Sequence, residues 1–152
     1  MEIYSKIKLP QMRQMLVFSL QDLSNPLYQK EKWISKKYHH GFWNNLELNL
    51  EFLYDDIVVY ERPEDAIGYV LVNWEENEIL RPLYKALDDV CEKIGENQPD
   101  SSYMDSPLWD RVVEAAAAAL KVFLKNEEEA KKTNPKAWQG EDDWGREPEC
   151  NH

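Results

Sequence analysis

Two long stretches of this chain repeat apolar residues with the period of an α-helix, and this feature constrains the fold more than any other. In residues 73–94 and again in residues 105–132, apolar residues recur at steps of three and four. The apolar positions are Ile79, Leu80, Leu83, Leu87, Val90, Cys91 and Ile94 in the first stretch, and Leu108, Val112, Ala115 or Ala116, Ala119, Leu120, Phe123 and Leu124 in the second. A helix with one apolar face must bury that face against another element, so the sequence predicts a mainly α-helical core.

Prolines mark the expected starts of the other helices. Pro10 suits the first turn of a helix that continues to Leu23. A second helix is expected from about Pro26 to Lys37, with Leu27, Trp33 and Ile34 as its apolar face. A cap at residues 105–106 followed by a proline predicts that the last helix opens there.

Several segments allow more than one interpretation. Pro82 falls inside residues 73–94, and because an interior proline costs a helix about 3 kcal/mol, we expect a kink or a new helix start there. Residues 44–56 alternate like a strand but also fit one helical face, and their Leu and Glu content favours a helix. Residues 57–60 favour an extended segment, residues 68–72 could form a short helix or a strand, and residues 96–102 read as a loop.

A length of 152 residues fits one domain. We predict a mainly α, compact multi-helix single domain of about five helices, with one short extended segment near 57–60 or 68–72 as an open possibility. The helical domain spans residues 1–133, and residues 134–152 form an acidic tail of a composition typical of disorder. Trp138 and Trp144 are unusual in such a tail, and they favour docking of the tail through its indoles.

Charge is distributed unevenly along the chain. The chain holds 29 Asp and Glu against 18 Lys and Arg, a formal net charge of −11. Residues 1–40 carry +4, residues 41–100 carry −11 and residues 101–152 carry −4. An acidic surface repels phosphate, so we expect no direct binding of nucleic acid. The acidic middle is either a solvated helical surface or a face that binds a basic protein.

The sequence also bears on location. No apolar run approaches the roughly 20 residues of a membrane span, and the residues after Met1 lack the pattern of a signal peptide. The two cysteines, Cys91 and Cys150, are no disulfide framework, and a reducing compartment suits them. We therefore expect a cytoplasmic protein without a membrane partner, and its oligomeric state stays open.

Clustered carboxylates are the main candidates for chemistry. They can cap helices, contact a partner, or serve acid–base chemistry and divalent ions, but no calcium-binding loop or nearby histidine supports the last two roles. His39, His40 and His152 lack metal-ligand spacing, and no phosphate-binding glycine motif is present. We therefore expect no catalytic residue, no metal and no cofactor. The clusters are Asp55-Asp56, Glu64-Asp65 and Glu75-Glu76-x-Glu78.

Aromatic residues are numerous, with six Trp and eight Tyr. Most should pack in the core, whereas exposed ones are the anchors that protein interfaces favour. Trp43, Trp74 and Trp109 are flanked by polar or acidic residues and could be either. An aromatic anchor within an acidic surface is the composition expected of a protein that docks a basic partner.

Several short motifs stand out along the chain: Leu53-Tyr54-Asp55-Asp56, Ala66-Ile67-Gly68-Tyr69, a helix with Leu83, Leu87 and Asp88, and Pro107-Leu108-Trp109-x-x-Val112-Val113-x-Ala115-Ala116. In these motifs the chain resembles a small family of bacterial proteins, some of which are immunity proteins encoded beside secreted toxins. An N-terminal helix leading into Asn25-Pro26-x-Tyr28-Gln29 also fits, so the resemblance covers roughly residues 10–125.

The resemblance implies a cytoplasmic immunity protein of a contact-dependent or polymorphic toxin system. Such a protein neutralises a cognate toxin domain, here a basic nuclease-type one, by occluding its active site with carboxylates where phosphates would bind. Two alternatives remain: a helical adaptor or regulatory protein that binds another cytoplasmic protein, and an enzyme that uses a pair of carboxylates. The expected contact residues are Asp55, Asp56, Glu61, Glu64, Asp65, Glu75, Glu76 and Glu78.

Overall fold

The computed structural model describes residues 7–34, 46–56, 62–95 and 98–133, and these residues are mainly helical. The prediction of a mainly α fold is confirmed. Two of the helices continue as π-helical turns, η1 after α2 and η2 after α3. The elements are α1 (Pro10–Leu23), α2 (Pro26–Tyr28), η1 (Gln29–Ile34), α3 (Leu46–Glu51), η2 (Phe52–Asp56), α4 (Pro63–Ala66), α5 (Trp74–Ile94), α6 (Asp100–Met104) and α7 (Trp109–Thr133).

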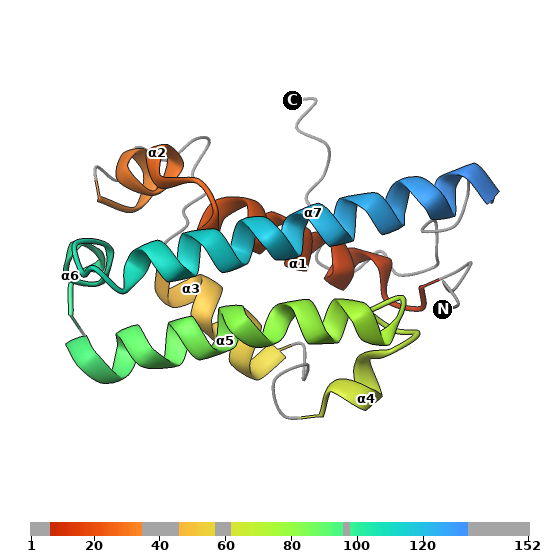
Figure 1. Cartoon of the computed structure of the whole chain (residues 1–152), viewed down its shortest axis with the longest axis horizontal. Helices are drawn as coiled ribbons and strands as arrows, with labels where there is room; N and C mark the ends of the chain where they lie inside the picture. Colours follow the sequence, from red (N-terminus) through yellow and green to blue (C-terminus); the bar gives the residue numbers. More distant parts are fainter. Residues whose placement is uncertain (1–6, 35–45, 57–61, 96–97, 134–152) are drawn as a thin grey trace.

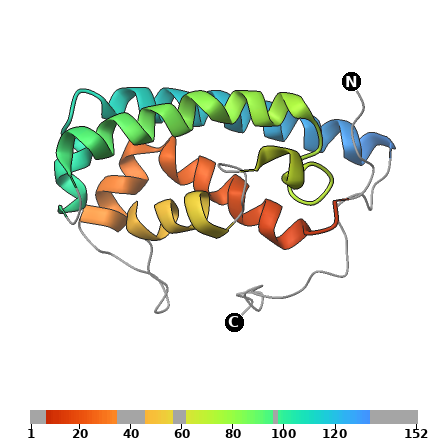
Figure 2. The same ribbon diagram turned by 90° about the horizontal axis from the view of Figure 1, so that it is seen from below.

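The helices form two layers. The long helices α5 and α7 run antiparallel, joined through α6, and make one layer (Figure 1). Helices α1, α2 and α3 make the second layer beneath them, as the view from below shows (Figure 2). The short helix α4 lies at the end of the molecule where α5 begins (Figure 1).

The core lies between these layers. The apolar faces predicted for α5 and α7 point inward: Leu80, Leu83, Leu87, Val90, Val112 and Phe123 are buried. Ala116 and Ala119 are fully buried, and small side chains at a contact let two helices pack closely. Leu16 and Leu20 of α1 complete the core from the second layer. Phe52 and Leu53 are also buried in this core. Residues 46–56 form α3 and η2, so the helical interpretation of residues 44–56 is confirmed from residue 46 onward.

Helix α5 corrects the expectation of a new helix start at Pro82. It runs unbroken from Trp74 to Ile94, with Pro82 exposed on its surface. Proline cannot donate a backbone hydrogen bond there, but the leucines on both sides of it, Leu80 and Leu83, are fully buried and hold the helix in place. Burial of the apolar face therefore outweighs the local cost of the proline.

Three further expectations also need correction. Helix α7 begins at Trp109, and Ser106 Oγ accepts the Leu108 N–H at 3.2 Å in the turn before it. Residues 100–102, expected as the end of a loop, belong to helix α6, which runs from Asp100 to Met104. Leu27 is 80% exposed and does not belong to the buried face predicted for the second helix. Trp33 is buried as predicted, whereas the end of that helix lies outside the described residues.

The connection from α4 to α5 is a turn, so the alternatives of helix or strand for residues 68–72 are both wrong. Gly68 adopts φ +88°, which a residue with a side chain rarely does. A single bridge joins Ile67 to Leu71. The chain before α1 fixes this turn from outside, because Lys8 N–H donates to Gly68 O at 3.2 Å and Leu9 N–H to Tyr69 O at 2.9 Å. Residues 57–60 lie outside the described part of the chain.

Candidate functional site

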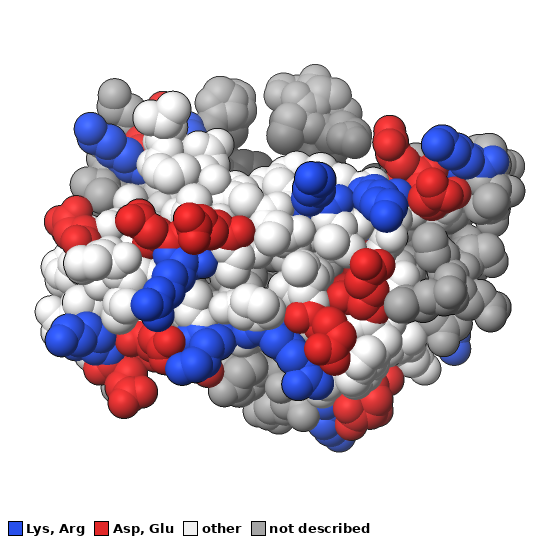
Figure 3. All heavy atoms as spheres, in the orientation of Figure 1, with Lys and Arg blue, Asp and Glu red and all other residues white. Residues whose placement is uncertain are grey.

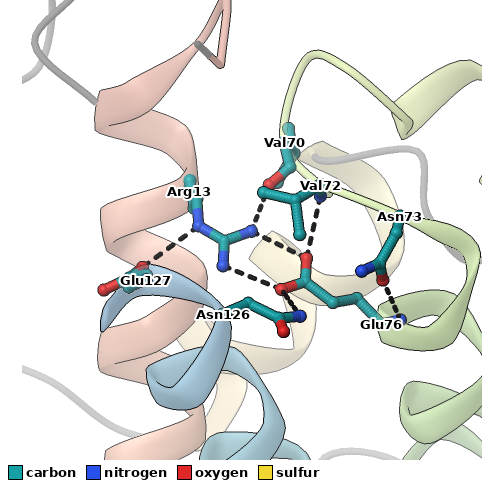
Figure 4. Close-up of polar contacts among 7 residues, drawn as sticks. All are labelled: Arg13, Val70, Val72, Asn73, Glu76, Asn126 and Glu127. Carbon is teal, nitrogen blue, oxygen red and sulfur yellow. Dashed lines mark hydrogen bonds and ion pairs between the residues drawn. The ribbon is translucent and has the colours of Figure 1, made fainter. Parts of the chain in front are cut away.

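A buried polar cluster joins both layers at the end of the molecule where α5 begins (Figure 4). Arg13 comes from the first turns of α1 and is 1% exposed, and Glu76 comes from the first turn of α5 and is fully buried. Asn126 and Glu127 reach the cluster from α7. Three helices that are distant in sequence therefore meet at these side chains.

Arg13 is bound on all sides of its guanidinium. Its Nη1 donates to Glu76 Oε1 at 2.8 Å and to the Val70 carbonyl at 2.9 Å, and its Nη2 donates to Glu76 Oε2 at 2.9 Å. Its Nε donates to Glu127 Oε2 at 3.0 Å. The guanidinium carbon lies 4.9 Å from the centre of the Phe123 ring. This forked geometry is the arrangement in which arginine binds a carboxylate most strongly.

Glu76 receives further donors. Val72 N–H donates to Oε1 at 2.9 Å, and Asn126 Nδ2 donates to Oε2 at 2.9 Å (Figure 4). Its backbone N–H donates to Asn73 Oδ1 at 3.0 Å, which caps the start of α5. Both carboxylate oxygens are thus held by two donors each. A carboxylate bound in this way serves as a structural clamp, and the loop 70–73 is fastened to it.

The structure removes Glu76 from the predicted partner-binding surface, because a fully buried side chain does not reach a partner. The physical reason is its position: Glu76 lies on the same helical face as Leu80 and Leu83, which points into the core.

The other predicted contact residues lie elsewhere. Glu64, Asp65, Glu75 and Glu78 are exposed. Asp65 Oδ2 lies 3.5 Å from Arg62 Nε, and Glu78 Oε1 lies 3.6 Å from Arg81 Nε, both as exposed pairs. Asp55 and Asp56 end η2, where their side chains are outside the described part, and Glu61 lies outside the described residues altogether.

The segment that holds the four exposed carboxylates also exposes two aromatic rings. Tyr69 is 43% exposed and Trp74 is 42% exposed. Both rings and the four exposed carboxylates lie within residues 63–78. This segment contains no Lys, Arg or His. We call residues 63–78 the acidic–aromatic segment. Lys8 Nζ lies 4.8 Å from the centre of the Tyr69 ring, so this ring face already accepts a cation within the chain.

Charges of both signs are interspersed over the outer face of α5 and α7 (Figure 3). Lys85 and Asp89 of α5 form one such pair, in which Lys85 Nζ donates to Asp89 Oδ1 at 2.8 Å, and this hydrogen bond raises the pKa of Lys85. The net charge of residues 41–100 therefore does not form a continuous acidic face on this side.

Two other ambiguous residues are settled by their surroundings. Trp109 is 4% exposed and its Nε1 donates to Gln29 Oε1 at 2.9 Å, so it is a core residue and no surface anchor. Cys91 is half-buried, and burial, followed by the nearby Asp88, raises the pKa of its thiol. A raised pKa disfavours a nucleophilic role, in agreement with the interpretation of Cys91 as a small apolar residue. Trp43 lies outside the described residues.

Sequence reasoning missed Arg13, although a signal was present. Arg13 stands three and seven residues before Leu16 and Leu20, in register with the buried face of α1. Arg13 is the one basic residue on the apolar face of α1, and Glu76 is the one acidic residue on the apolar face of α5. Because charged side chains are rarely buried alone, this pattern indicates a buried ion pair.

Within the described residues, no group of three or more His, Cys, Asp or Glu side chains is placed to hold a metal ion. None of the helices in the described part has the length and apolarity needed to cross a membrane.

Comparison with known proteins gives one result. Residues 7–131 match the model of a family described as a domain of unknown function, DUF7945. No curated protein and no solved structure matches the chain.

Proposed function

Because the chain belongs to the DUF7945 family, whose description assigns no function, we propose its function from its own surface: it is a non-catalytic protein that binds a basic protein partner. The more specific form of this proposal is a cytoplasmic immunity protein that occludes the active site of a cognate toxin domain. The observation that carries the proposal is the acidic–aromatic segment, because residues 63–78 expose both carboxylates and aromatic rings.

The composition of this segment fits a partner rich in Lys and Arg. Tyr and Trp are enriched among residues that dominate interface energies, and both bind cations over their ring faces. Glu64 and Glu75 supply negative charge beside Tyr69 and Trp74. Complementary charge speeds the encounter of two proteins and disfavours partners of the wrong sign.

The buried cluster makes this surface rigid. Glu76 holds the loop between Tyr69 and Trp74 through Val72 N–H, and Arg13 holds it through the Val70 carbonyl. A surface that is ordered before binding loses less conformational entropy when the partner arrives. The structural carboxylate thus supports the surface carboxylates without touching the partner.

Occlusion requires no chemistry by this chain. In a nuclease-type domain, basic residues hold nucleic-acid phosphates, and the carboxylates of the acidic–aromatic segment would pair with the same residues. The attraction should weaken as salt rises, because exposed charges are screened over about 10 Å at 0.1 M ionic strength.

The test is co-purification of the chain with the product of the adjacent gene at low and high salt. The doubly reversed variant Glu64→Lys/Glu75→Lys should associate more slowly, and its association rate should depend less on salt. Asp110→Lys/Glu114→Lys changes the net charge equally at exposed positions in the first turns of α7, at the opposite end of the molecule from the start of α5 (Figure 1), and it should keep most of the rate. Equal association rates for the two variants would show that the interface does not lie on the acidic–aromatic segment. Capture of a non-toxic protein would identify an adaptor instead.

A further inference from the structure

The outward face of α1 carries no charge. Its exposed residues are Gln14, Met15, Phe18 and Gln21. The two charged residues of this helix do not add to the face, because Arg13 is buried in the polar cluster and Asp22 is half-buried. The exposed positions of α5 and α7, in contrast, include Lys, Arg, Asp and Glu (Figure 3). Among the three long helices of the described residues, α1 alone therefore exposes an uncharged face.

The four exposed residues of α1 form one stripe. Residues three or four positions apart are neighbours on the surface of a helix. Phe18 stands four residues after Gln14, three after Met15 and three before Gln21, so it touches the middle of the stripe. Phe18 is 53% exposed and Met15 is 39% exposed. Aromatic and Met side chains without charge are the composition of the buried centre of a protein interface.

The composition of this stripe is complementary to itself. A two-fold interface brings the same surface of two copies together, so each residue must tolerate its own kind. Met15 and Phe18 can bury apolar surface against the same residues of another copy. The amides of Gln14 and Gln21 each carry both hydrogen-bond donors and an acceptor, so amides of two copies can bond to one another.

The charge of the whole chain favours a second copy as the occupant of this face. Each copy carries a net charge of −11, so two copies repel each other wherever their exposed carboxylates meet. An exposed helix face without charge is where this repulsion is smallest. A basic partner would find no carboxylate on the face to pair with, whereas a second copy needs none.

We propose that two copies of this chain associate through the outward face of α1, with Met15 and Phe18 at the centre of a two-fold interface. Leu27 of α2 and Leu48 of α3, which are 80% and 39% exposed, supply further apolar surface in the same layer (Figure 2). The inference concerns residues outside the acidic–aromatic segment and does not depend on the proposed function.

The size of the face sets the expected strength of this dimer. Helix α1 has 14 residues and is therefore about 21 Å long. Standard interfaces bury roughly 800 Å² on each partner and reach dissociation constants from micromolar to picomolar. A contact centred on one helix of this length belongs to the small end of that range. The dimer should therefore be reversible, with a dissociation constant in the micromolar range or weaker.

Sedimentation equilibrium of the full chain tests the association. The mean mass should rise from 18.0 kDa toward twice this value as the concentration increases to roughly 1 mM. Added salt should favour the dimer, because it screens the repulsion between the two acidic copies. A mass of 18.0 kDa at every concentration would overturn the proposal. That result is expected if the tail covers the face instead, through Trp138 or Trp144, which lie outside the described residues.

Two charged variants locate the interface on α1. Gln14→Glu/Gln21→Glu and Gln14→Lys/Gln21→Lys should each weaken the dimer by at least about tenfold, because like charges then face each other. An equal mixture of the two variants should dimerise again, since opposite charges meet whichever way the two helices run. Ala117→Glu/Ala118→Glu is the matched control for the first variant, because it adds the same charge at exposed positions of α7 and should stay close to the parent. A mixture that remains monomeric would contradict the proposal.

A further variant tests the apolar centre of the interface without adding charge. Met15→Gln/Phe18→Gln replaces two exposed side chains, so its circular dichroism spectrum should match that of the parent. Its dissociation constant should rise at least several-fold, because the apolar contact is lost. A dissociation constant equal to that of the parent would place the contact on another surface and overturn the proposal.

Discussion

Replacing Arg13 by Met removes one side of the buried cluster while keeping a long unbranched side chain in its place. The variant loses four hydrogen bonds, two to Glu76, one to the Val70 carbonyl and one to Glu127. Glu76 stays fully buried with Val72 N–H and Asn126 Nδ2 as its remaining donors in the cluster. Its negative charge is then no longer balanced.

The cost follows from that unbalanced charge. Breaking a buried ion pair by removing one partner lowers the free energy of unfolding by about 3–5 kcal/mol. Domains of this size have a free energy of unfolding of roughly 5–15 kcal/mol in total, so Arg13→Met should remove a large share of it. At roughly 2–4 °C for each kcal/mol, the expected fall in the melting temperature is about 6–20 °C.

Urea unfolding followed by circular dichroism measures this loss. The companion variant Arg13→Met/Glu76→Gln removes the buried charge but keeps an oxygen that accepts the Val72 N–H, so it should be more stable than Arg13→Met alone. Arg81→Met is the matched control, because Arg81 is 61% exposed and its pair with Glu78 is screened by solvent. This control should change stability by no more than about 0.5 kcal/mol.

The reasoning would be refuted by a loss below about 1 kcal/mol for Arg13→Met, because a broken buried ion pair should cost about 3–5 kcal/mol. It would also fail if the added Glu76→Gln substitution destabilised the Arg13→Met variant further, since that would show that the buried charge itself is not the source of the cost.

Two further predictions concern α5. Asn73→Ala removes the oxygen that accepts the Glu76 N–H, so the urea midpoint should fall by the equivalent of about 1 kcal/mol, whereas Asn73→Ser, which keeps an uncharged accepting oxygen at this buried position, should stay closer to the parent. In a Cys150→Ser background, Cys91 should react more slowly with iodoacetamide at pH 8 when folded than when unfolded, because burial raises its pKa and leaves less thiolate. The difference between the folded and unfolded reaction rates should become smaller as the pH rises through the pKa of the folded thiol. A difference that does not change with pH would show that the fold restricts access of the reagent to Cys91 instead.

The helices could be predicted because their information is local. Apolar residues at helical spacing in α5 and α7 must face a core wherever the rest of the chain lies. At Pro82 the same logic leaves a kink and a new helix start open. The new start does not occur, because the burial of Leu80 and Leu83 keeps α5 continuous, and that burial is a tertiary property. The logic fails at residues 68–72, whose turn is held by backbone bonds to residues 8 and 9, some sixty positions earlier.

The candidate site could be predicted only in part, for a similar reason. Charge counting treats every carboxylate of residues 41–100 as available, but Glu76 is neutralised inside the molecule by Arg13. Asp65, Glu78 and Asp89 each have an exposed basic partner. These three pairs lie three or four residues apart, a spacing that the sequence itself displays. The pairing of Arg13 with Glu76 is what sequence cannot supply, because it depends on which helices meet.

The pairing in turn decides which experiment is informative. A reversal at Asp65 or Glu78 breaks a contact with Arg62 or Arg81 as well as changing charge, so its effect on association would mix two causes. A reversal at Glu76 would unfold the cluster and report on stability alone. Glu64 and Glu75 are exposed carboxylates beside Tyr69 and Trp74, and reversing these two changes the field of the acidic–aromatic segment while leaving the described ion pairs intact. If salt-dependent association is lost in Glu64→Lys/Glu75→Lys and kept in the control variant, the acidic–aromatic segment is the surface that binds the basic partner.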